Sequence, residues 1–513
     1  MINLPTRISD IIKPWAEHSP KHPALIESSD AWTYLQLATA VAEAQLWLQE
    51  QGIRPGDRVM LVCENCRAFV AILLALSEID AWPALVNARL AAKEVDEIRE
   101  HSSARRVIYT TSVSPHAREH AKRHGAVTQE IASLDQIAIG PLNENTQPEP
   151  LDADVAQRVA ALIYTSGTTG QPKGVMLTHR NLLFVAEVSA KIRSLTPDDR
   201  LYGVLPMSHA VGLSVVLLGS LLSGATLYLA WRFDPVAALA TLEKDKLTVV
   251  LGAPSMFSLL ADYAKLKGLS KLNYPALRII SSSGAPLPPA LKSQVENLFG
   301  LPLHNGYGVT ECSPNISQAV VTERRTDTSV GKVLPGVEVQ LVGSDGKREG
   351  EVGELWVRGP NVMKGYYRAP DETAAAINPE GWFNTRDLAR LDNGYLFIVG
   401  RAKELIIRFG ENVYPAEVEA VLNTHPAVAR SAVIGRPVAG TEGGEEVIAF
   451  VQLAPSSTTS ETELSQHAGQ HLAPYKRPSQ IIFVPSMPLT PIGKVIKGEL
   501  AKMLQASSAE PAS

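Results

Sequence analysis

One short segment of this chain combines glycines, hydroxyl side chains and a lysine in a pattern that suits an anion. It spans residues 164–175 and directly follows the apolar run 159–163. Glycines allow backbone N–H groups to turn toward an anion, hydroxyls add donors without bulk, and Lys173 supplies a compact positive charge. The segment predicts a phosphate-binding loop, with an ordinary flexible loop as the alternative. A Walker A loop is not expected, because Pro172 precedes the lysine and Gly174 follows it.

Length and charge limit the classes of protein to be considered. The chain has 513 residues, which predicts about two to four subdomains rather than one core. Its 48 basic and 53 acidic residues give a formal net charge of -5, so there is no basic excess for nucleic acid. An anionic substrate must then be held by a few local groups.

The stretch 201–231 contains no Asp, Glu, Lys or Arg, so it has to be weighed as a membrane span. Proline and glycine residues interrupt it, and 225–230 has the pattern of a strand after a short buried helix. At the N-terminus, residues 1–14 lack the apolar core of a signal peptide. We expect no integral membrane segment, no export and a cytoplasmic location.

The chain contains three cysteines, Cys63, Cys66 and Cys312. The spacing of the first two is found in zinc and redox sites, but no second pair of cysteines or histidines stands at metal-ligand spacing. The prediction is buried or half-buried reduced thiols, which fits a reducing cytoplasm.

Apolar runs alternate with amphipathic stretches along the first 300 residues. This alternation predicts an α/β fold with mainly parallel sheets. The expected strands include 58–62, 106–109, 249–253 and 277–281, and the expected helices include 34–51 and 91–101.

The texture of the sequence changes twice in its second half. From about residue 328, short strands and glycine-rich turns predict a β-rich subdomain. After residue 400 a compact α+β pattern begins, and it ends in small polar residues. We expect a large N-terminal region of several subdomains over 1–400, a smaller mobile domain over 401–505 and a disordered tail over 506–513.

The segment 164–175 resembles the phosphate loop of the adenylate-forming superfamily, which includes acyl-CoA synthetases, adenylation domains of peptide synthetases and luciferases. Further segments resemble the family's motifs in the same order, and the resemblance extends from about residue 32 to 497. These segments are 206–209, 283–286, 307–311, 382–387, 400–406, 410–415 and 488–494. The resemblance implies an ATP-dependent acyl-CoA ligase that forms an acyl-AMP intermediate, releases pyrophosphate and transfers the acyl group to coenzyme A.

The same resemblance implies which residues bind the nucleotide and Mg2+. Tyr307 would lie near the adenine, Thr310 would contact the α-phosphate, Glu311 would help to hold Mg2+, and Asp387 would accept hydrogen bonds from the ribose hydroxyls. Most relatives have glycine where Arg386 stands, which leaves the local loop shape open. The phosphate loop and the adenine pocket would further use Thr165, Ser166, Gly167, Thr168, Thr169, Gly170, Lys173, Gly284, Ala285, Pro286, Asn305, Gly306 and Gly308.

Residues near the C-terminus resemble the moving part of the family's machinery. Lys494 would contact the carboxylate and the α-phosphate during adenylation, and Lys403 would be the hinge about which the C-terminal domain turns. Arg401 would contact ribose or phosphate. The thiol side would use Gly410 beside the pantetheine channel, Arg477 near the nucleotide part of CoA, and His209 between the acyl pocket and the thiol channel.

Two alternatives to a CoA ligase remain at this point. One is an adenylation enzyme that loads a carrier protein, and the other is a catalytically silent protein that binds ATP or acyl-AMP. Retention of all the charged motif residues argues against a silent protein. The expected partners are ATP, CoA and a small carboxylic acid, and the protein is expected to be a monomer or homodimer. In the family that the chain resembles, the strand at Gly306 faces the acyl pocket. The missing side chain would leave this pocket deep, so a medium to long aliphatic acid or an aromatic acid is expected.

Overall fold

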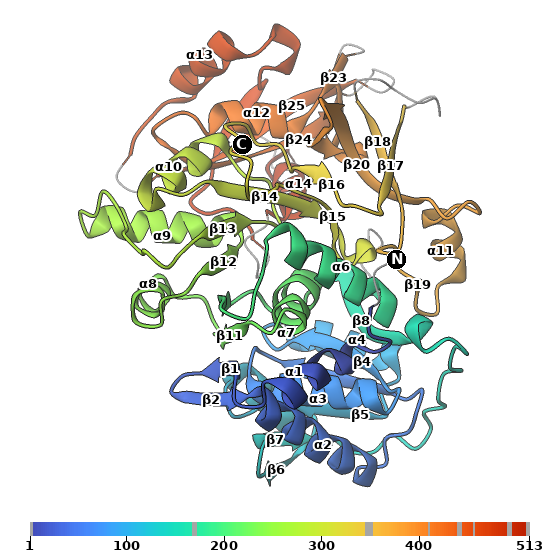
Figure 1. Cartoon of the computed structure of the whole chain (residues 1–513). Helices are drawn as coiled ribbons and strands as arrows, with labels where there is room; N and C mark the ends of the chain where they lie inside the picture. Colours follow the sequence, from blue (N-terminus) through green and yellow to red (C-terminus); the bar gives the residue numbers. More distant parts are fainter. Residues whose placement is uncertain are drawn as a thin grey trace.

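The computed structural model describes residues 4–166, 172–343, 352–408, 411–438, 444–454, 457–489 and 495–508. In the N-terminal region, two large sheets lie one above the other with helices between and around them (Figure 1). One sheet has the order β16 (Lys332–Val333), β15 (Asn315–Gln318), β14 (Leu303–Gly308), β13 (Ile279–Ser282), β12 (Val249–Gly252), β10 (Arg200–Gly203), β11 (Thr226–Leu229), β1 (Pro23–Glu27) and β2 (Asp30–Thr33). The other has the order β19 (Gly365–Tyr366), β9 (Pro172–Thr178), β8 (Val159–Ser166), β4 (Trp82–Asn87), β3 (Arg58–Cys63), β5 (Arg106–Tyr109), β7 (Asp135–Ile139) and β6 (Val127–Ile131).

The centres of both sheets are parallel, as the alternating pattern predicted. Strands β10, β12, β13 and β14 run parallel in the first sheet, and β8, β4, β3 and β5 do so in the second. Parallel strands are covered on both faces, so they are formed by nearly continuous apolar runs. Every residue of β3 and β4 is buried, which shows this rule directly.

Two helices are almost completely buried. They are α3 (Arg67–Glu78) and α6 (His179–Ile192), and their apolar residues belong to the largest core cluster. A helix that is apolar on most of its circumference has to be enclosed, which here fastens the two sheets together. The helices around them are α1 (Lys13–His18), α2 (Tyr34–Glu50), α4 (Ala92–Ser102), α5 (Pro115–Arg123), α7 (Gly219–Leu222), α8 (Pro235–Lys244), α9 (Pro254–Leu266), α10 (Pro289–Phe299) and α11 (Pro370–Ala376).

The expected β-rich subdomain is an antiparallel sheet of four strands. Its order is β17 (Glu338–Val342), β18 (Gly353–Arg358), β20 (Phe383–Asp392) and β21 (Tyr395–Arg401). Strand β21 leads into the short 3-10 helix η5 (Ala402–Glu404), where the C-terminal module begins.

The C-terminal module is a smaller α+β unit, as predicted (Figure 1, orange to red). Its elements are β22 (Ile406–Arg408), β23 (Glu411–Val413), α12 (Pro415–Leu422), β24 (Val428–Pro437), β25 (Glu445–Leu453), α13 (Glu461–His471), β26 (Gln480–Phe483) and α14 (Lys497–Ser508). The predicted tail begins too early, because α14 continues three residues into it and Leu500 and Leu504 anchor that helix in a core cluster. Residues 509–513 lie outside the described part.

The uncharged stretch 201–231 folds as β10, the π-helix η3 (Val211–Leu218), α7 and β11. Its proline and glycines divide it into these pieces, as expected from the sequence. In the residues that the structure describes, no helix is long and apolar enough to cross a membrane.

All three cysteines are free and buried, as predicted. Burial raises the pKa of each thiol, so the reactive thiolate form is disfavoured. The described residues contain no cluster of three or more histidine, cysteine, aspartate or glutamate side chains that could hold a metal ion.

Candidate active site

The predicted phosphate loop is carried by a β-hairpin next to β19, the edge strand of the second sheet. Strands β8 and β9 are antiparallel, and their register sets Thr165 opposite Lys173 at the end of the hairpin. Tyr164 packs on Gly174, and an added Cβ there would lie 3.3 Å from its ring, which is a tight contact. Residues 167–170, predicted to contact the phosphates, lie outside the described residues.

Lys173 is held by two side chains from the segment that follows β18. It forms an ion pair with Glu372 of α11, and its Nζ lies 5.3 Å from the centroid of the Tyr366 ring. The Tyr366 hydroxyl donates a hydrogen bond of 2.9 Å to Oε1 of Glu311. The structure therefore links the predicted phosphate-binding lysine to the predicted Mg2+-binding carboxylate through one tyrosine.

Thr310 and Glu311 lie in the 3-10 turn η4 (Thr310–Cys312), directly after β14. The Glu311 carbonyl accepts a 2.8 Å hydrogen bond from the backbone N–H of Met363, which fixes this turn. At Gly308, an added Cβ would lie 1.8 Å from the carbonyl oxygen of Pro314. Glycine is required there because the chain folds back tightly on itself.

Asp387, predicted to bind ribose, Arg401, predicted to bind ribose or phosphate, and Tyr307, predicted to lie near the adenine, form a connected group. The Tyr307 hydroxyl donates to Oδ2 of Asp387 at 2.5 Å, and Nε of Arg401 lies 3.1 Å from Oδ1 of the same carboxylate. Asp387 and Arg401 are direct partners in the β20–β21 ladder. Burial and the neighbouring Asp387 carboxylate raise the pKa of Tyr307, so its hydroxyl stays protonated and can donate.

Arg386 forms the turn at which most relatives have glycine, and its backbone conformation shows how. Arg386 has a φ of +59°, in the left-handed region that glycine adopts without steric cost. The side chain of Asn384 accepts a 2.7 Å hydrogen bond from the backbone N–H of Arg386, which helps to hold this turn. The turn can thus be made without glycine, and Asp387 still reaches its partners.

The two predicted adenine-binding segments lie side by side. Strands β13 and β14 are parallel, and their register pairs Ser282 with Asn305, so both chains leave the sheet at the same edge. Gly284 has a φ of +88°, and no atom lies within 4 Å of where its Cβ would be. A Cβ at residue 284 would therefore meet no described atom, although the positive φ favours glycine there.

His209 lies in a loop at the carboxyl end of β10, just before the π-helix η3. Burial, with a contribution from the positive charge of Arg89, lowers the pKa of His209 to about 4, so the imidazole is neutral at pH 7. Gly212 permits the tight path, because an added Cβ would lie 2.2 Å from the Pro206 carbonyl oxygen.

A residue that the sequence motifs did not indicate holds this loop. Asn65 is buried, and its amide nitrogen lies 3.0 to 3.2 Å from the carbonyl oxygens of Gly203, Leu205 and Ala230. Its side-chain oxygen accepts a 2.9 Å hydrogen bond from Met207 N–H. An isolated asparagine gives no sequence signal for such a role, since its partners are more than 130 residues away.

Of the residues predicted in the C-terminal module, Arg477 and Lys403 lie within the described part of the chain. Arg477 donates to the backbone carbonyls of Leu472 and Gly469, both at 3.0 Å, so its guanidinium is engaged within its own module. Lys403 lies in η5, between β21 and the module, at a place compatible with a hinge. The predicted residues Gly410 and Lys494 lie outside the described residues.

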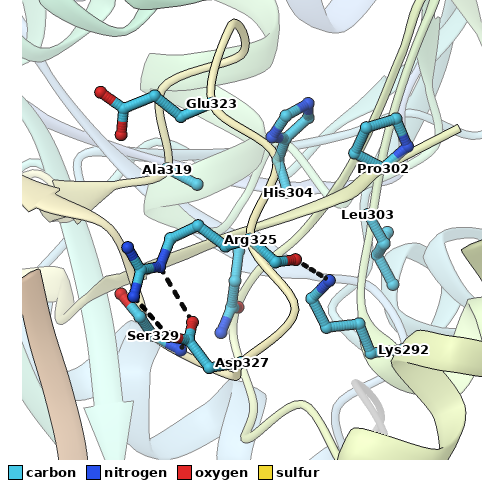
Figure 2. A pocket seen from close by; sticks show the side chains of 10 residues that line it. Lys292, Pro302, Leu303, His304, Ala319, Glu323, Arg325, Asp327 and Ser329 are labelled. Atoms are coloured by element: carbon cyan, nitrogen blue, oxygen red, sulfur yellow. Dashed lines mark hydrogen bonds and ion pairs between the residues drawn. The ribbon is translucent and has the colours of Figure 1, made fainter.

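A small cavity is lined by Lys292, His304 and Arg325 (Figure 2), and Asn305, predicted for the adenine pocket, also lines it. Lys292 donates to the carbonyl oxygen of Arg325 at 2.7 Å, and Arg325 pairs with Asp327, so the loop after β15 is held against the sheet. The space is about 10 Å³, which is close to one water and far too small for a nucleotide or an acid. Burial, with the charges of Arg193 and Lys292, lowers the pKa of His304 on this wall to about 4.

The side chains of Glu311, Lys173 and Asp387 are of the types that suit Mg2+ and ATP. Carboxylate oxygen is the ligand type that Mg2+ prefers, and Glu311 presents it beside a lysine suited to phosphate. Asp387 offers a buried acceptor at the place expected for ribose.

Comparison with known proteins decides which family this arrangement represents. Residues 12–367 match the AMP-binding enzyme family, and residues 417–494 match the AMP-binding enzyme C-terminal domain. The chain belongs to the AMP-binding enzymes. It is an AMP-forming acid–thiol ligase that uses ATP, Mg2+ and coenzyme A and proceeds through an acyl-AMP intermediate.

Individual relatives cover nearly the whole chain. A feruloyl-CoA synthase of Amycolatopsis sp is 36% identical over 95% of this chain and 97% of that protein, and 4-coumarate–CoA ligase 3 of Oryza sativa subsp. japonica is 30% identical over 94% and 90%. Among solved structures, ATP-bound MatB from Rhodopseudomonas palustris has a TM-score of 0.85 at 28% identity and covers 97% of this chain and 99% of its own. The o-succinylbenzoate CoA synthetase of Bacillus subtilis, bound to ATP and magnesium, has a TM-score of 0.81 at 29% identity and covers 96% and 99%.

Proposed function

We propose that this ligase activates an aromatic carboxylic acid, with hydroxycinnamic acids such as ferulic and 4-coumaric acid as the first candidates. The similarity to feruloyl-CoA synthase and 4-coumarate–CoA ligases along nearly the whole chain supports this choice. Medium or long aliphatic acids are the second candidates, because Gly306 adds no side chain to the wall beside Tyr307. A cytoplasmic location is part of the proposal, and the three buried reduced thiols support it.

The observation that carries the proposal is the meeting of the predicted nucleotide residues at one edge of the fold. Tyr307, Asp387 and Arg401 contact one another, and Glu311 and Lys173 are joined through Tyr366. These residues come from distant parts of the sequence. Tyr307 lies in β14 and Glu311 in the turn that follows it, so one member of each group lies on this short stretch of chain.

In the proposed first half-reaction, the acid oxygen attacks the α-phosphate of ATP and pyrophosphate leaves. Lys173 and Lys494 would offset the negative charge that develops, and Thr310 would donate to the α-phosphate. Mg2+ held at Glu311 would neutralise the phosphates that leave. Asp387 and Arg401 would orient the ribose, so that the reacting atoms meet in a fixed geometry.

In the proposed second half-reaction, the C-terminal module turns about Lys403 and the thiol of CoA replaces AMP on the acyl group. The thiol sulfur forms the new bond to the acyl carbon, its proton leaves to solvent, and AMP departs with the electrons of the broken bond. His209 would line the thiol path as a neutral imidazole, since its pKa of about 4 keeps it uncharged at pH 7. Arg477 and Gly410 would lie along the route of CoA.

The decisive experiment is an acid screen with separate readouts for the two half-reactions. Ferulate, 4-coumarate, benzoate, hexanoate and acetate would be supplied with ATP, Mg2+ and CoA, and pyrophosphate release and thioester formation would be measured. We expect the two hydroxycinnamates to give the highest kcat/KM and acetate the lowest, because a short acid forfeits roughly 0.8 kcal/mol for each methylene left unburied. A preference for acetate, or pyrophosphate release without thioester, would contradict the proposal.

The Gly306→Trp variant tests the pocket itself. An added Cβ at Gly306 would lie 3.4 Å from the Ser317 carbonyl oxygen, which is tight but tolerable, and a bulky ring beyond it would fill the proposed pocket. The variant should lose activity toward ferulate more than toward acetate. Unchanged relative kcat/KM values would remove Gly306 from the acyl pocket.

A further inference from the structure

The phosphate end of the site contains a tyrosine to which none of the sequence motifs assigned a role. Tyr366 lies at the end of β19, and its backbone pairs with Val175 of β9. Its hydroxyl donates to Glu311, and its ring faces Lys173. One half-buried side chain therefore contacts both the carboxylate expected to hold Mg2+ and the ammonium expected to hold phosphate.

We propose that Tyr366 is a positioning residue for Mg·ATP, whose hydroxyl holds the Glu311 carboxylate in place while its ring holds Lys173. The inference rests on the proposed role of this edge in nucleotide binding. A phenol O–H that donates to a carboxylate restricts the direction in which the other carboxylate oxygen points. The face of an aromatic ring attracts an ammonium and limits its positions in the same way.

The surroundings of Tyr366 keep it rigid enough for this role. Its backbone N–H donates to Oγ1 of Thr373 at 2.9 Å, and Thr373 in turn donates to the Ala369 carbonyl oxygen at 2.9 Å. At Gly365, an added Cβ would lie 2.8 Å from the Thr373 side chain, so β19 packs directly on α11. Because β19 is paired with β9, Tyr366 is fixed to the same hairpin that carries Lys173.

The test separates the hydroxyl from the ring. In Tyr366→Phe the ring that faces Lys173 remains while the donor to Glu311 is lost, and in Tyr366→Leu both are lost. Nucleotide affinity would be measured by titration calorimetry without acid or CoA, once with ATP and excess Mg2+ and once with ATP and EDTA. We expect Tyr366→Phe to raise the Kd about tenfold with Mg2+ and to leave it unchanged with EDTA. Tyr366→Leu should weaken binding under both conditions.

The neighbouring tyrosine provides a matched control. Tyr367 donates its hydroxyl to Oε1 of Glu149 at 2.6 Å, away from Glu311, so Tyr367→Phe removes the same atom one residue further on. Its affinity for Mg·ATP should equal that of the wild type. A second check combines Tyr366→Phe with Glu311→Gln. The hydroxyl loss should matter less in that background, because the carboxylate on which it acts has gone.

Three outcomes would overturn the role of Tyr366. They are an unchanged Mg·ATP affinity in Tyr366→Phe, an equal loss with Mg2+ and with EDTA, or full additivity with Glu311→Gln. An EDTA affinity equal to that of the wild type shows in addition that the variant is folded. If the wild type itself failed to bind Mg·ATP, the proposed function would fall instead. If the wild type ligates acids and Tyr366→Phe binds Mg·ATP with normal affinity, the proposed function stands and the positioning role of Tyr366 is excluded.

Discussion

The cluster of Tyr307, Asp387 and Arg401 in the N-terminal region and the C-terminal module use their charged residues for different purposes. The three residues come from β14, β20 and β21, and Tyr307 and Arg401 both bind the Asp387 carboxylate. We propose that this cluster holds the nucleotide, so its charged groups would serve the ligand.

In the C-terminal module, the charged residues mainly fasten the module to itself. Lys497 at the start of α14 lies 3.0 Å from Glu404 and 2.8 Å from Glu419, so it joins α14, η5 and α12. Arg477 is bound to backbone carbonyls of the same module. A unit that is braced internally and connected through η5 can turn as one body. The difference suggests that the N-terminal region sets nucleotide affinity and the module sets the rate of each half-reaction.

Lys494→Ala should show the largest effect, because it removes a module residue that is predicted to act on chemistry alone. Loss of one preorganised positive charge in a transition state costs on the order of 10²- to 10³-fold in rate. Acyl-AMP formation, followed by pyrophosphate release, should fall by that factor. ATP affinity and the thioester reaction from supplied acyl-AMP should remain. Near-normal pyrophosphate release would exclude Lys494 from the mechanism.

Asp387→Ala tests whether the N-terminal region sets nucleotide affinity. It removes the acceptor shared by Tyr307 and Arg401, and hydrogen bonds to a charged group contribute about 1.5–3 kcal/mol, or roughly 10- to 100-fold in affinity. The Kd of ATP without acid should rise by that factor. Asp392→Ala is the control, since Asp392 lies exposed at the end of the same strand and pairs with Arg390 at 3.2 Å. Equal Kd values for the two variants would contradict a ribose role for Asp387.

Two buried histidines should make the stability of the N-terminal region depend on pH. Burial lowers the pKa of His179 to about 3 and of His304 to about 4, below the usual 6.5, so both are neutral in the folded N-terminal region. The unfolded chain binds more protons below pH 6.5, so the stability contributed by each group is complete above 6.5 and is lost as the pH falls toward the folded value. At pH 5 each should cost about 2 kcal/mol. Urea midpoints at pH 7.5 and 5.0 should differ accordingly, and less so in His304→Gln. A midpoint that does not change with pH would refute this expectation.

Lys403→Pro should separate the two half-reactions. Proline fixes φ near the value of a 3-10 helix, so η5 can persist while rotation about residue 403 is hindered. Acyl-AMP formation should continue, and thioester formation should fall by about tenfold or more. Lys403→Ala, which removes the charge without restricting the backbone, should keep both. If the proline variant ran both half-reactions normally, the hinge would lie elsewhere.

The smallest expected effect is an improvement. Glu372 pairs with Lys173 in the structure, and its side chain is 43% exposed, so the pair is partly screened by solvent. Glu372→Gln would free the ammonium for phosphate, and we expect the Kd of Mg·ATP to fall roughly two- to fivefold. Calorimetry in low and high salt checks this, since the gain should shrink as salt rises. Weaker binding would show that Glu372 supports the nucleotide site rather than competing with it.

The nucleotide motifs could be found in the sequence because each is continuous. A phosphate loop, a turn after a strand and a ribose motif each place their functional atoms within a few residues, so type and spacing are visible without a structure. The order of strands and helices was also predictable, because buried parallel strands such as β3 and β4 are apolar along their whole length. The tail was predicted to start at residue 506, and α14 continues three residues into it. The last turn of α14 is formed by small polar residues, which give no apolar periodicity from which a helix could be predicted.

The sequence by itself determined the family and the reaction and predicted which motifs bind the nucleotide, because these depend on local combinations of glycine, lysine and carboxylates. Tertiary structure alone decided which residues support them. Tyr366 lies 55 positions from Glu311, and Asn65 lies 142 positions from Met207, so no local pattern links either pair. Their roles arise because β19 joins the phosphate hairpin and because the carboxyl ends of β3, β10 and β11 meet. Contacts between strands distant in sequence are set by sheet order, which a residue pattern along the chain does not record.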